Sequence, residues 1–238
     1  MRRPFRFKQF LIEQDRAPMK VGTDGVLLGA WAGEGSPKRI LDIGTGTGLI
    51  AMMLAQRFPE STITAIEPNE LAVADASANF KNSAFAERLV LQQTSLDEFS
   101  AEEKFDLIVS NPPYFSKSLV SQDEGRTQAR HSYSLSPKEL SRSSKMLSEE
   151  GRIVVIYTPD SYEKFKMEMK NIDFSESRIL RVKPMLEKDF HRIIGEFSKE
   201  STLQKSSEIT IEKYGRHHYS EEYIELTKDF YLFEGKQA

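Results

Sequence analysis

The 238-residue sequence has no cysteine, which excludes disulfide bonds, thiolate metal sites, iron–sulfur clusters and cysteine nucleophiles. It also has no apolar run near the roughly 20 residues of a transmembrane helix, and its first residues lack the apolar core of a signal peptide. Neither sign of charge dominates, since 33 Lys and Arg are balanced by 36 Asp and Glu. Any contact with nucleic acid must therefore be a local patch. We expect a cytoplasmic protein.

Short β-rich segments alternate with helical patterns from Arg39 onward, which is typical of parallel strands joined by crossover helices. Strands are predicted at 39–43, 62–66, 89–92, 105–110 and 152–157, and further ones at 177–182, 192–197 and 208–212. No linker rich in Pro, Gly or Ser interrupts the series. The sequence predicts one α/β domain over 1–238, with an N-terminal extension (1–38), a core (39–160) and a C-terminal helix and sheet edge (161–238).

Helical patterns fill the segments between the strands. Helices are predicted at 49–58 and 161–170, and Pro137 is expected in the first turn of another. In the helix after the second strand, Leu71, Ala74 and Ala78 form a single apolar stripe. Before the first strand, Thr23 or Asp24 is expected to cap a short helix that ends at Trp31.

The glycine-rich turn Gly44-Thr45-Gly46-Thr47-Gly48 follows the first strand of this series, where an open α/β sheet binds ligands. Its spacing is not that of a dinucleotide fingerprint, which would need glycine at position 49, and no Gly-Lys-Ser/Thr of a P-loop follows. At the end of the next strand, the Glu67 carboxylate before Pro68 can accept hydrogen bonds from both hydroxyls of a ribose. The two features together indicate an adenosyl ligand without a pyrophosphate.

A second motif, Asn111-Pro112-Pro113-Tyr114, ends the strand predicted at 105–110. The prolines have no N–H, so the turn offers acceptors, namely the Asn111 amide oxygen and the Pro112 carbonyl. A planar amino group that donates to both would be positioned for attack on a methyl group, and Tyr114 offers a ring for stacking. The turn therefore predicts methyl transfer to an amino or amide nitrogen.

These motifs resemble known enzymes. Leu-Asp-Ile-Gly-Thr-Gly-Thr-Gly followed by Ile-Glu-Pro is similar to the cofactor site of class I S-adenosylmethionine-dependent methyltransferases, and Asn-Pro-Pro-Tyr resembles the signature of amino- and amide-directed N-methyltransferases. The resemblance implies a Rossmann-like fold, a mostly parallel seven-stranded sheet with an antiparallel C-terminal edge, and S-adenosylmethionine as cofactor without a metal. It implies that Asp42 and the glycine turn hold the methionine end of the cofactor and Glu67 the ribose.

The implied site comprises two sets of residues. The catalytic residues are Asn111, Pro112 and Tyr114, and the cofactor-binding residues are Thr23, Asp42, Gly44, Thr45, Gly46, Gly48, Glu67, Pro68, Ser95, Leu96 and Asn111. Many class I enzymes have an Asp after the third strand that bonds the cofactor adenine. This sequence has Ser95 there, so either Ser95 takes that role or Asp97 reaches in from one turn later.

Flanking segments narrow the substrate. The stretch Met19 to Trp31, the triplet Ala129-Arg130-His131 and the stretch Asp229 to Leu232 resemble the bacterial family that methylates N6 of adenosine 37 in valine tRNA. In that family, residues 20–25 would cover the methionine end of the cofactor. The implied partner is a tRNA anticodon loop.

The charge of the N-terminus agrees with an RNA partner, because residues 1–20 carry a net charge of +4, with Phe5, Phe7 and Phe10 interleaved. Cations and aromatic rings suit single-stranded RNA. The predicted RNA-binding residues are Arg2, Arg3, Phe5, Arg6, Arg126, Arg130 and His131. His217 and His218 are interpreted as surface residues, because no third metal ligand is evident beside them.

Other functions remain open at this point. A release-factor glutamine N5-methyltransferase would use the same turn, but such enzymes typically carry a helical N-terminal domain for which this chain has no room. Another alternative is an rRNA or DNA amino-methyltransferase, of which a DNA adenine methyltransferase would usually need a target-recognition domain and a basic surface. An adenosyl-binding regulator without activity would not need Asn111 and Tyr114.

Overall fold

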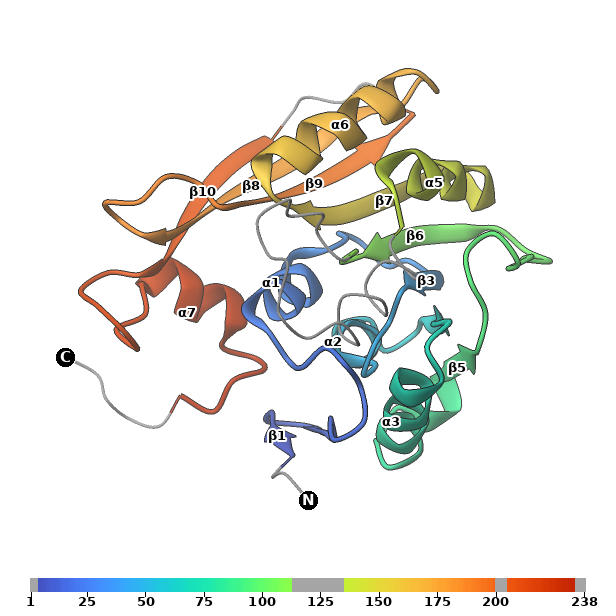
Figure 1. Cartoon of the computed structure of the whole chain (residues 1–238), viewed down its shortest axis with the longest axis horizontal. Helices are drawn as coiled ribbons and strands as arrows, with labels where there is room; N and C mark the ends of the chain where they lie inside the picture. Colours follow the sequence, from blue (N-terminus) through green and yellow to red (C-terminus); the bar gives the residue numbers. More distant parts are fainter. Residues whose placement is uncertain (1–3, 113–134, 200–204, 234–238) are drawn as a thin grey trace, which may run out of the picture.

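The computed structural model describes residues 4–112, 135–199 and 205–233. Its centre is an eight-stranded sheet with the order β10-β8-β9-β7-β6-β3-β4-β5 (Figure 1). The strands are β3 (Arg39–Ile43), β4 (Thr62–Ile66), β5 (Leu89–Gln92), β6 (Phe105–Ser110), β7 (Leu147–Tyr157), β8 (Ser175–Met185), β9 (Arg192–Ser198) and β10 (Lys205–Glu212). A separate hairpin of β1 (Phe5–Arg6) and β2 (Leu11–Ile12) lies near the N-terminus. The predicted α/β fold is confirmed, and each predicted strand lies within an observed one.

The seven-stranded sheet implied by the resemblance was wrong, because β10 adds an eighth strand. The outermost strand is also not antiparallel, since β10 pairs in parallel with β8. The one antiparallel member of the described sheet is β9, between β7 and β8. The eighth strand is held by its apolar face, because Ile209 and Ile211 are buried in the same hydrophobic cluster as Leu180 and Val182 of β8.

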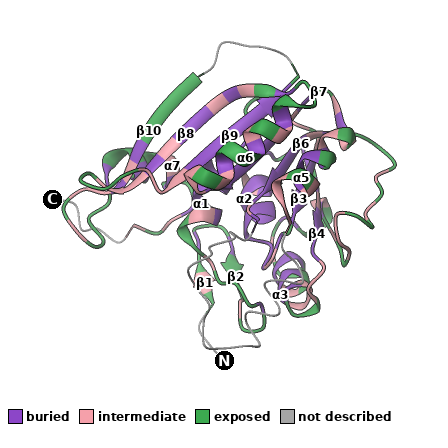
Figure 2. Ribbon diagram, turned by 45° about the horizontal axis from the view of Figure 1, so that its top comes forward, coloured by how far each residue is buried: buried purple, intermediate pink, exposed green. Residues whose placement is uncertain are grey.

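Helices cover both faces of the sheet. They are α1 (Thr23–Trp31), α2 (Leu49–Arg57), α3 (Glu70–Lys81), α5 (Pro137–Ser141), α6 (Pro159–Lys170) and α7 (Glu221–Thr227), with short 3-10 turns at Ala86–Arg88 and Arg142–Met146. One cluster of buried residues contains side chains of α1, α2 and α7, and a second contains side chains of α6. Figure 2 shows the strands between them as largely buried.

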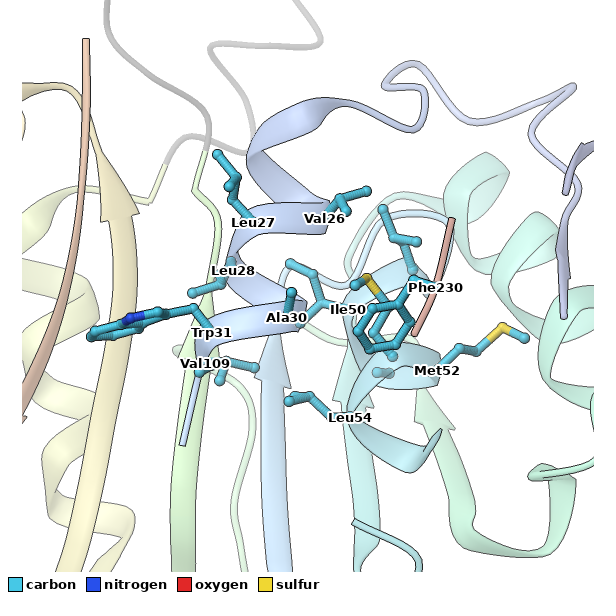
Figure 3. Packing of buried hydrophobic residues seen from close by; sticks show 14 of the residues in the cluster. Val26, Leu27, Leu28, Ala30, Trp31, Ile50, Met52, Leu54, Val109 and Phe230 are labelled. Carbon is cyan, nitrogen blue, oxygen red and sulfur yellow. The ribbon is translucent and has the colours of Figure 1, made fainter. Parts of the chain in front are cut away.

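The first helix lies very close to α2. A Cβ at Gly29 would lie 2.6 Å from the Met53 sulfur, so only glycine permits this approach. Leu28 and Trp31 of α1 pack in the same cluster as Ile50 of α2 (Figure 3). The predicted cap was wrong, because Gly22 is the N-cap residue and no side chain bonds there.

The face that α3 buries also differs from the predicted stripe. Leu71 is 54% exposed, whereas the buried residues are Ala72, Asp75, Ala76, Asn79 and Phe80. The apolar pattern pointed to the wrong face because two of the buried side chains are polar. Their partners come from the N-terminal segment, which no helical periodicity reveals. The prediction for Pro137 is confirmed, since it opens α5 after a capping box formed by Ser136 and Glu139.

Candidate active site

The glycine turn joins β3 to α2 at the carboxyl edge of the sheet. Gly44, Gly46 and Gly48 all have positive φ, at 71°, 59° and 84°, a conformation that other residues rarely adopt. A Cβ on Gly44 or Gly46 would meet no atom within 4 Å, whereas one on Gly48 would collide with the Phe80 ring. The first two glycines therefore leave open space beside the backbone, and the third allows close packing against α3.

Asp42, the fourth residue of β3, is completely buried beneath this turn. Its Oδ2 accepts hydrogen bonds from the Thr45 hydroxyl at 2.6 Å and from the Ala51 N–H at 3.2 Å. Its Oδ1 has no hydrogen-bond partner among the described residues. Burial raises the pKa of the Asp42 carboxyl to about 7, and the hydrogen bond from Thr45 opposes this shift. Asp42 thus fixes the turn and the start of α2 from below.

Glu67 links β4 to the same turn. Its two carboxylate oxygens accept from the Gly46 N–H and the Asn69 N–H, both at 2.9 Å. Burial raises the pKa of this carboxyl, and these hydrogen bonds oppose the shift. A carboxylate oxygen has a second lone pair, so each can still accept from a hydroxyl group. Pro68, which follows, is half-buried.

Asn79 of α3 ties the glycine turn to the N-terminal segment, a role that the sequence analysis missed. Its amide nitrogen donates to the carbonyls of Thr47 at 2.8 Å and Glu13 at 2.9 Å, and its oxygen accepts from the Glu13 N–H at 2.7 Å. One turn earlier, Asp75 Oδ2 accepts from the N–H groups of Arg16 and Ala17 at 2.9 and 2.8 Å. The segment that leads into α1 is therefore fixed beside the turn.

The Asn111-Pro112 turn follows β6, the strand next to β3. The hydroxyl of Ser110 donates to the carbonyl of Ile43 at 2.9 Å, which holds the ends of the two strands together. Asn111 is half-buried and Pro112 is buried. A Cβ on Gly25 of α1 would lie 4.0 Å from Asn111 Nδ2, so the first turns of α1 lie beside this side chain. Tyr114 lies outside the described residues.

Other predicted cofactor residues are exposed or half-buried. Thr23 is the exposed first residue of α1, and Leu96 packs partly against the second hydrophobic cluster. The Ser95 hydroxyl donates to Glu98 at 2.9 Å. Asp97 is 67% exposed and lies 3.9 Å from Arg142. A contact of Ser95 or Asp97 with the cofactor adenine stays a prediction.

Several known proteins are similar to this chain in sequence or in fold. Residues 22–170 match a family model described as a methyltransferase small domain. A protein from Christiangramia forsetii named tRNA1(Val) (adenine(37)-N6)-methyltransferase is 45% identical over 96% of this chain and 98% of its own length. A protein of the same name from Parabacteroides distasonis is 45% identical over 96% of this chain and 97% of its own.

The chain belongs to this tRNA1(Val) (adenine(37)-N6)-methyltransferase family. A solved structure of a predicted O-methyltransferase from Agrobacterium tumefaciens has the same fold, with a TM-score of 0.67 at 18% identity over 87% of this chain and 96% of that one. The class I methyltransferase fold implied by the resemblance is thereby confirmed.

Phe7 and Phe10, two of the three N-terminal aromatic residues, do not form the RNA-stacking surface expected from the sequence. Phe7 and Phe10 are only 2% and 6% exposed, and their rings stack on each other at 4.8 Å. Phe5 is half-buried, with its ring centroid 6.1 Å from that of Tyr231. Phe5 and Phe7 pack against Tyr231 of the C-terminal segment, whereas Phe10 packs against Phe85. Aromatic spacing alone could not distinguish this packing from an RNA surface.

The N-terminal cations also divide into two groups. Lys8 Nζ donates to the carbonyl of Lys228 at 2.5 Å, and Lys20 Nζ donates to that of Ala17 at 2.9 Å, so both are used within the fold. Arg6 is exposed. The other predicted RNA-binding residues, Arg2, Arg3, Arg126, Arg130 and His131, lie outside the described residues. In the described part of the chain, no helix is long and apolar enough to cross a membrane, and no group of three His, Asp or Glu could hold a metal.

Proposed function

We propose that this protein transfers a methyl group from S-adenosylmethionine to N6 of adenosine 37 in a tRNA. The observation that carries the proposal is the Asn111-Pro112 turn at the end of β6, joined through Ser110 to the glycine turn at the end of β3. The Asn111-Pro112 turn occurs in a chain that is 45% identical to proteins named for this activity, and this similarity supports the choice of substrate.

The residues around the glycine turn fit S-adenosylmethionine. The open space beside Gly44 and Gly46 suits a ligand that approaches the backbone, and no basic residue of the turn calls for a phosphate. Glu67, whose oxygens retain acceptor capacity, would hold the ribose, with Pro68, Thr45 and Gly48 shaping the wall. Asp42 would support the methionine end from beneath, and Thr23 would cover it. When bound, S-adenosylmethionine supplies an electrophilic methyl group.

The chain's own part in the reaction is to position the amine. The Asn111 amide oxygen and the Pro112 carbonyl would accept hydrogen bonds from the two N–H groups of the adenine N6, so that its lone pair points toward the methyl group. The same oxygens would stabilise the positive charge that develops on nitrogen. The proton leaves after transfer, so no general base is needed beforehand. Tyr114 would stack on the adenine, which must be unpaired to reach the site.

The remaining parts of the proposal concern the protein around the site. Arg2, Arg3, Phe5, Arg6, Arg126, Arg130 and His131 would contact the RNA. We also propose a single domain over 1–238, supported by a hydrophobic cluster that contains residues from Phe7 to Phe230. Because its proposed substrate is tRNA, we propose that the protein acts in the cytoplasm.

The test is a methylation assay with tRNA, DNA and a release factor in parallel, followed by mass spectrometry of the digested RNA. We expect N6-methyladenosine at position 37 and no product on DNA. Asn111→Ala should lower the rate about 100-fold, corresponding to about 3 kcal/mol of lost transition-state stabilisation. Its affinity for S-adenosylmethionine, measured by calorimetry, should stay within a few-fold of the parent. Asn171→Ala, at the exposed end of α6, is the control.

A parent-like rate for Asn111→Ala would refute the proposed mechanism. A methylated glutamine in the release factor, with unmodified tRNA, would refute the proposed substrate.

A further inference from the structure

The two outer strands β8 and β10 extend beyond the edge of the sheet that carries the candidate active site. Pairing places Ser110, the last residue of β6, level with Val155, Gly195, Ile179 and then Ser206 across the sheet. From that row β8 continues to Met185 and β10 to Glu212, six residues further in each case. At about 3.3 Å per residue this is a projection of roughly 20 Å. Figure 1 shows β8 and β10 passing the end of β6.

The loop at the tip of β10, residues 213–219, is basic and aromatic. Its sequence Lys-Tyr-Gly-Arg-His-His-Tyr contains two cations, two histidines and no acidic residue. Tyr214 is 82% exposed, and Arg216, His217 and His218 are exposed as well. Arg216 forms no ion pair with any residue that the structure describes. Its charge is thus available to a partner.

This loop is also held in a defined shape. The Lys213 N–H donates to the His218 carbonyl at 2.8 Å, and the His218 N–H donates to the Gly215 carbonyl at 3.1 Å. His217 has a positive φ of 70°, which is uncommon outside glycine, and its N–H donates to Glu212 Oε1 at 2.8 Å. A loop fixed by its own hydrogen bonds presents its side chains at a small entropic cost on binding.

We propose that residues 213–219 form a docking site for the phosphate backbone of the tRNA anticodon stem. The proposal rests on the proposed function. A loop with positive charge only, an exposed ring and a preformed shape suits a phosphate backbone with bases or sugars alongside. It would supply the local patch that the net charge of −3 requires.

The position of the loop assigns it to the stem rather than to the reacting base. β10 is four strand positions from β6, which is about 19 Å sideways in addition to the projection of about 20 Å. The loop is therefore roughly 28 Å from the Asn111 turn, too far to touch an adenine held there. A contact at that distance would be made to nucleotides several positions away from the reacting adenosine. Phosphates are the feature that all nucleotides share.

The test compares two double variants with the same change in charge. Lys213→Glu/Arg216→Glu alters the loop, and Lys164→Glu/Lys170→Glu alters exposed positions on α6 as the control. For the loop variant we expect the Kd for tRNA to rise about tenfold or more and the slope of log K against log salt to become shallower by about 1 to 2. The affinity for S-adenosylmethionine and kcat at saturating tRNA should be unchanged.

A second substrate locates the contact. With a short single-stranded RNA that contains adenosine 37 but no stem, the loop variant and the parent should have equal KM values. An unchanged Kd and salt slope for tRNA in the loop variant, or an equal loss in the α6 control, would overturn the docking site while leaving the proposed function intact. If the parent enzyme produces no N6-methyladenosine in tRNA, the proposed function fails and this proposal fails with it.

Discussion

Replacing Asp75 by alanine removes the acceptor of two backbone N–H groups, those of Arg16 and Ala17, at a position where the carboxylate is only 4% exposed. A hydrogen bond to a charged group contributes about 1.5–3 kcal/mol, so two bonds correspond to about 3–6 kcal/mol if the segment stays in place. The segment can instead detach, which lets its amides bond to water. The loss is then limited to the cost of that local opening, and we expect about 3 kcal/mol.

Detachment of residues 13–17 has a functional consequence, because this segment leads into α1 beside Asn111 and is tied through Asn79 to the glycine turn. We therefore expect Asp75→Ala to weaken S-adenosylmethionine binding as well as stability. Asp75→Asn keeps an oxygen that can accept both bonds but loses the charge, so its effects should be intermediate. Ser77→Ala, at an exposed position on the same helix, should behave as the parent.

Three measurements test this prediction. Hydrogen exchange should show faster exchange of the Arg16 and Ala17 amides in Asp75→Ala, and chemical denaturation should show a lower free energy of unfolding. Calorimetry reports the cofactor affinity. If both amides keep the protection of the parent and the stability is unchanged, Asp75 does not hold this segment.

Four shorter predictions concern the rest of the site. Gly48→Ala should lose about 2–5 kcal/mol of stability by denaturation, since its left-handed backbone is strained and the new methyl group meets Phe80. Burial raises the pKa of Asp42 from 3.8 to about 7, so the stability it contributes when protonated is lost as the pH rises through that range. The free energy of unfolding of the parent, measured by denaturation relative to that of Asp42→Asn, should therefore fall as the pH rises from 4 to 8. Arg192→Ala, which breaks the 2.8 Å ion pair to Asp24 in α1, should lower kcat more than Arg192→Lys does. EDTA should leave turnover unchanged, because the proposed transfer uses no metal.

The strands of the sheet could be predicted from the sequence because buried parallel strands are short apolar runs bounded by turn residues. β3, β4, β5 and β6 have the predicted bounds. The glycine turn could be located as well, since its position after a strand and its spacing are local properties of the chain.

The errors have a common cause, which is long-range packing. The buried face of α3 was assigned wrongly because Asp75 and Asn79 are polar, and their burial depends on backbone groups of residues 13–17. Phe7 and Phe10 looked like RNA contacts because the sequence does not show that Tyr231 stacks on Phe7 and that Phe85 packs against Phe10. The direction of β10 likewise depends on which neighbour the strand pairs with.

The parts of the chain that carry the chemistry differ from those that select the substrate. The predicted O-methyltransferase from A. tumefaciens shares this fold at 18% identity, so the fold alone does not select an amine of tRNA. The methyltransferase small domain match covers residues 22–170 and leaves out the N-terminal segment, β8, β9, β10 and α7. These outer parts include the 213–219 loop and the segment held by Asp75 and Asn79, which lie on either side of the Asn111 turn in the chain. Recognition of a particular RNA should therefore be altered by substitutions in the 213–219 loop, and methyl transfer by substitution of Asn111. The loop variant should raise the Kd for tRNA without changing kcat, and Asn111→Ala should lower the rate.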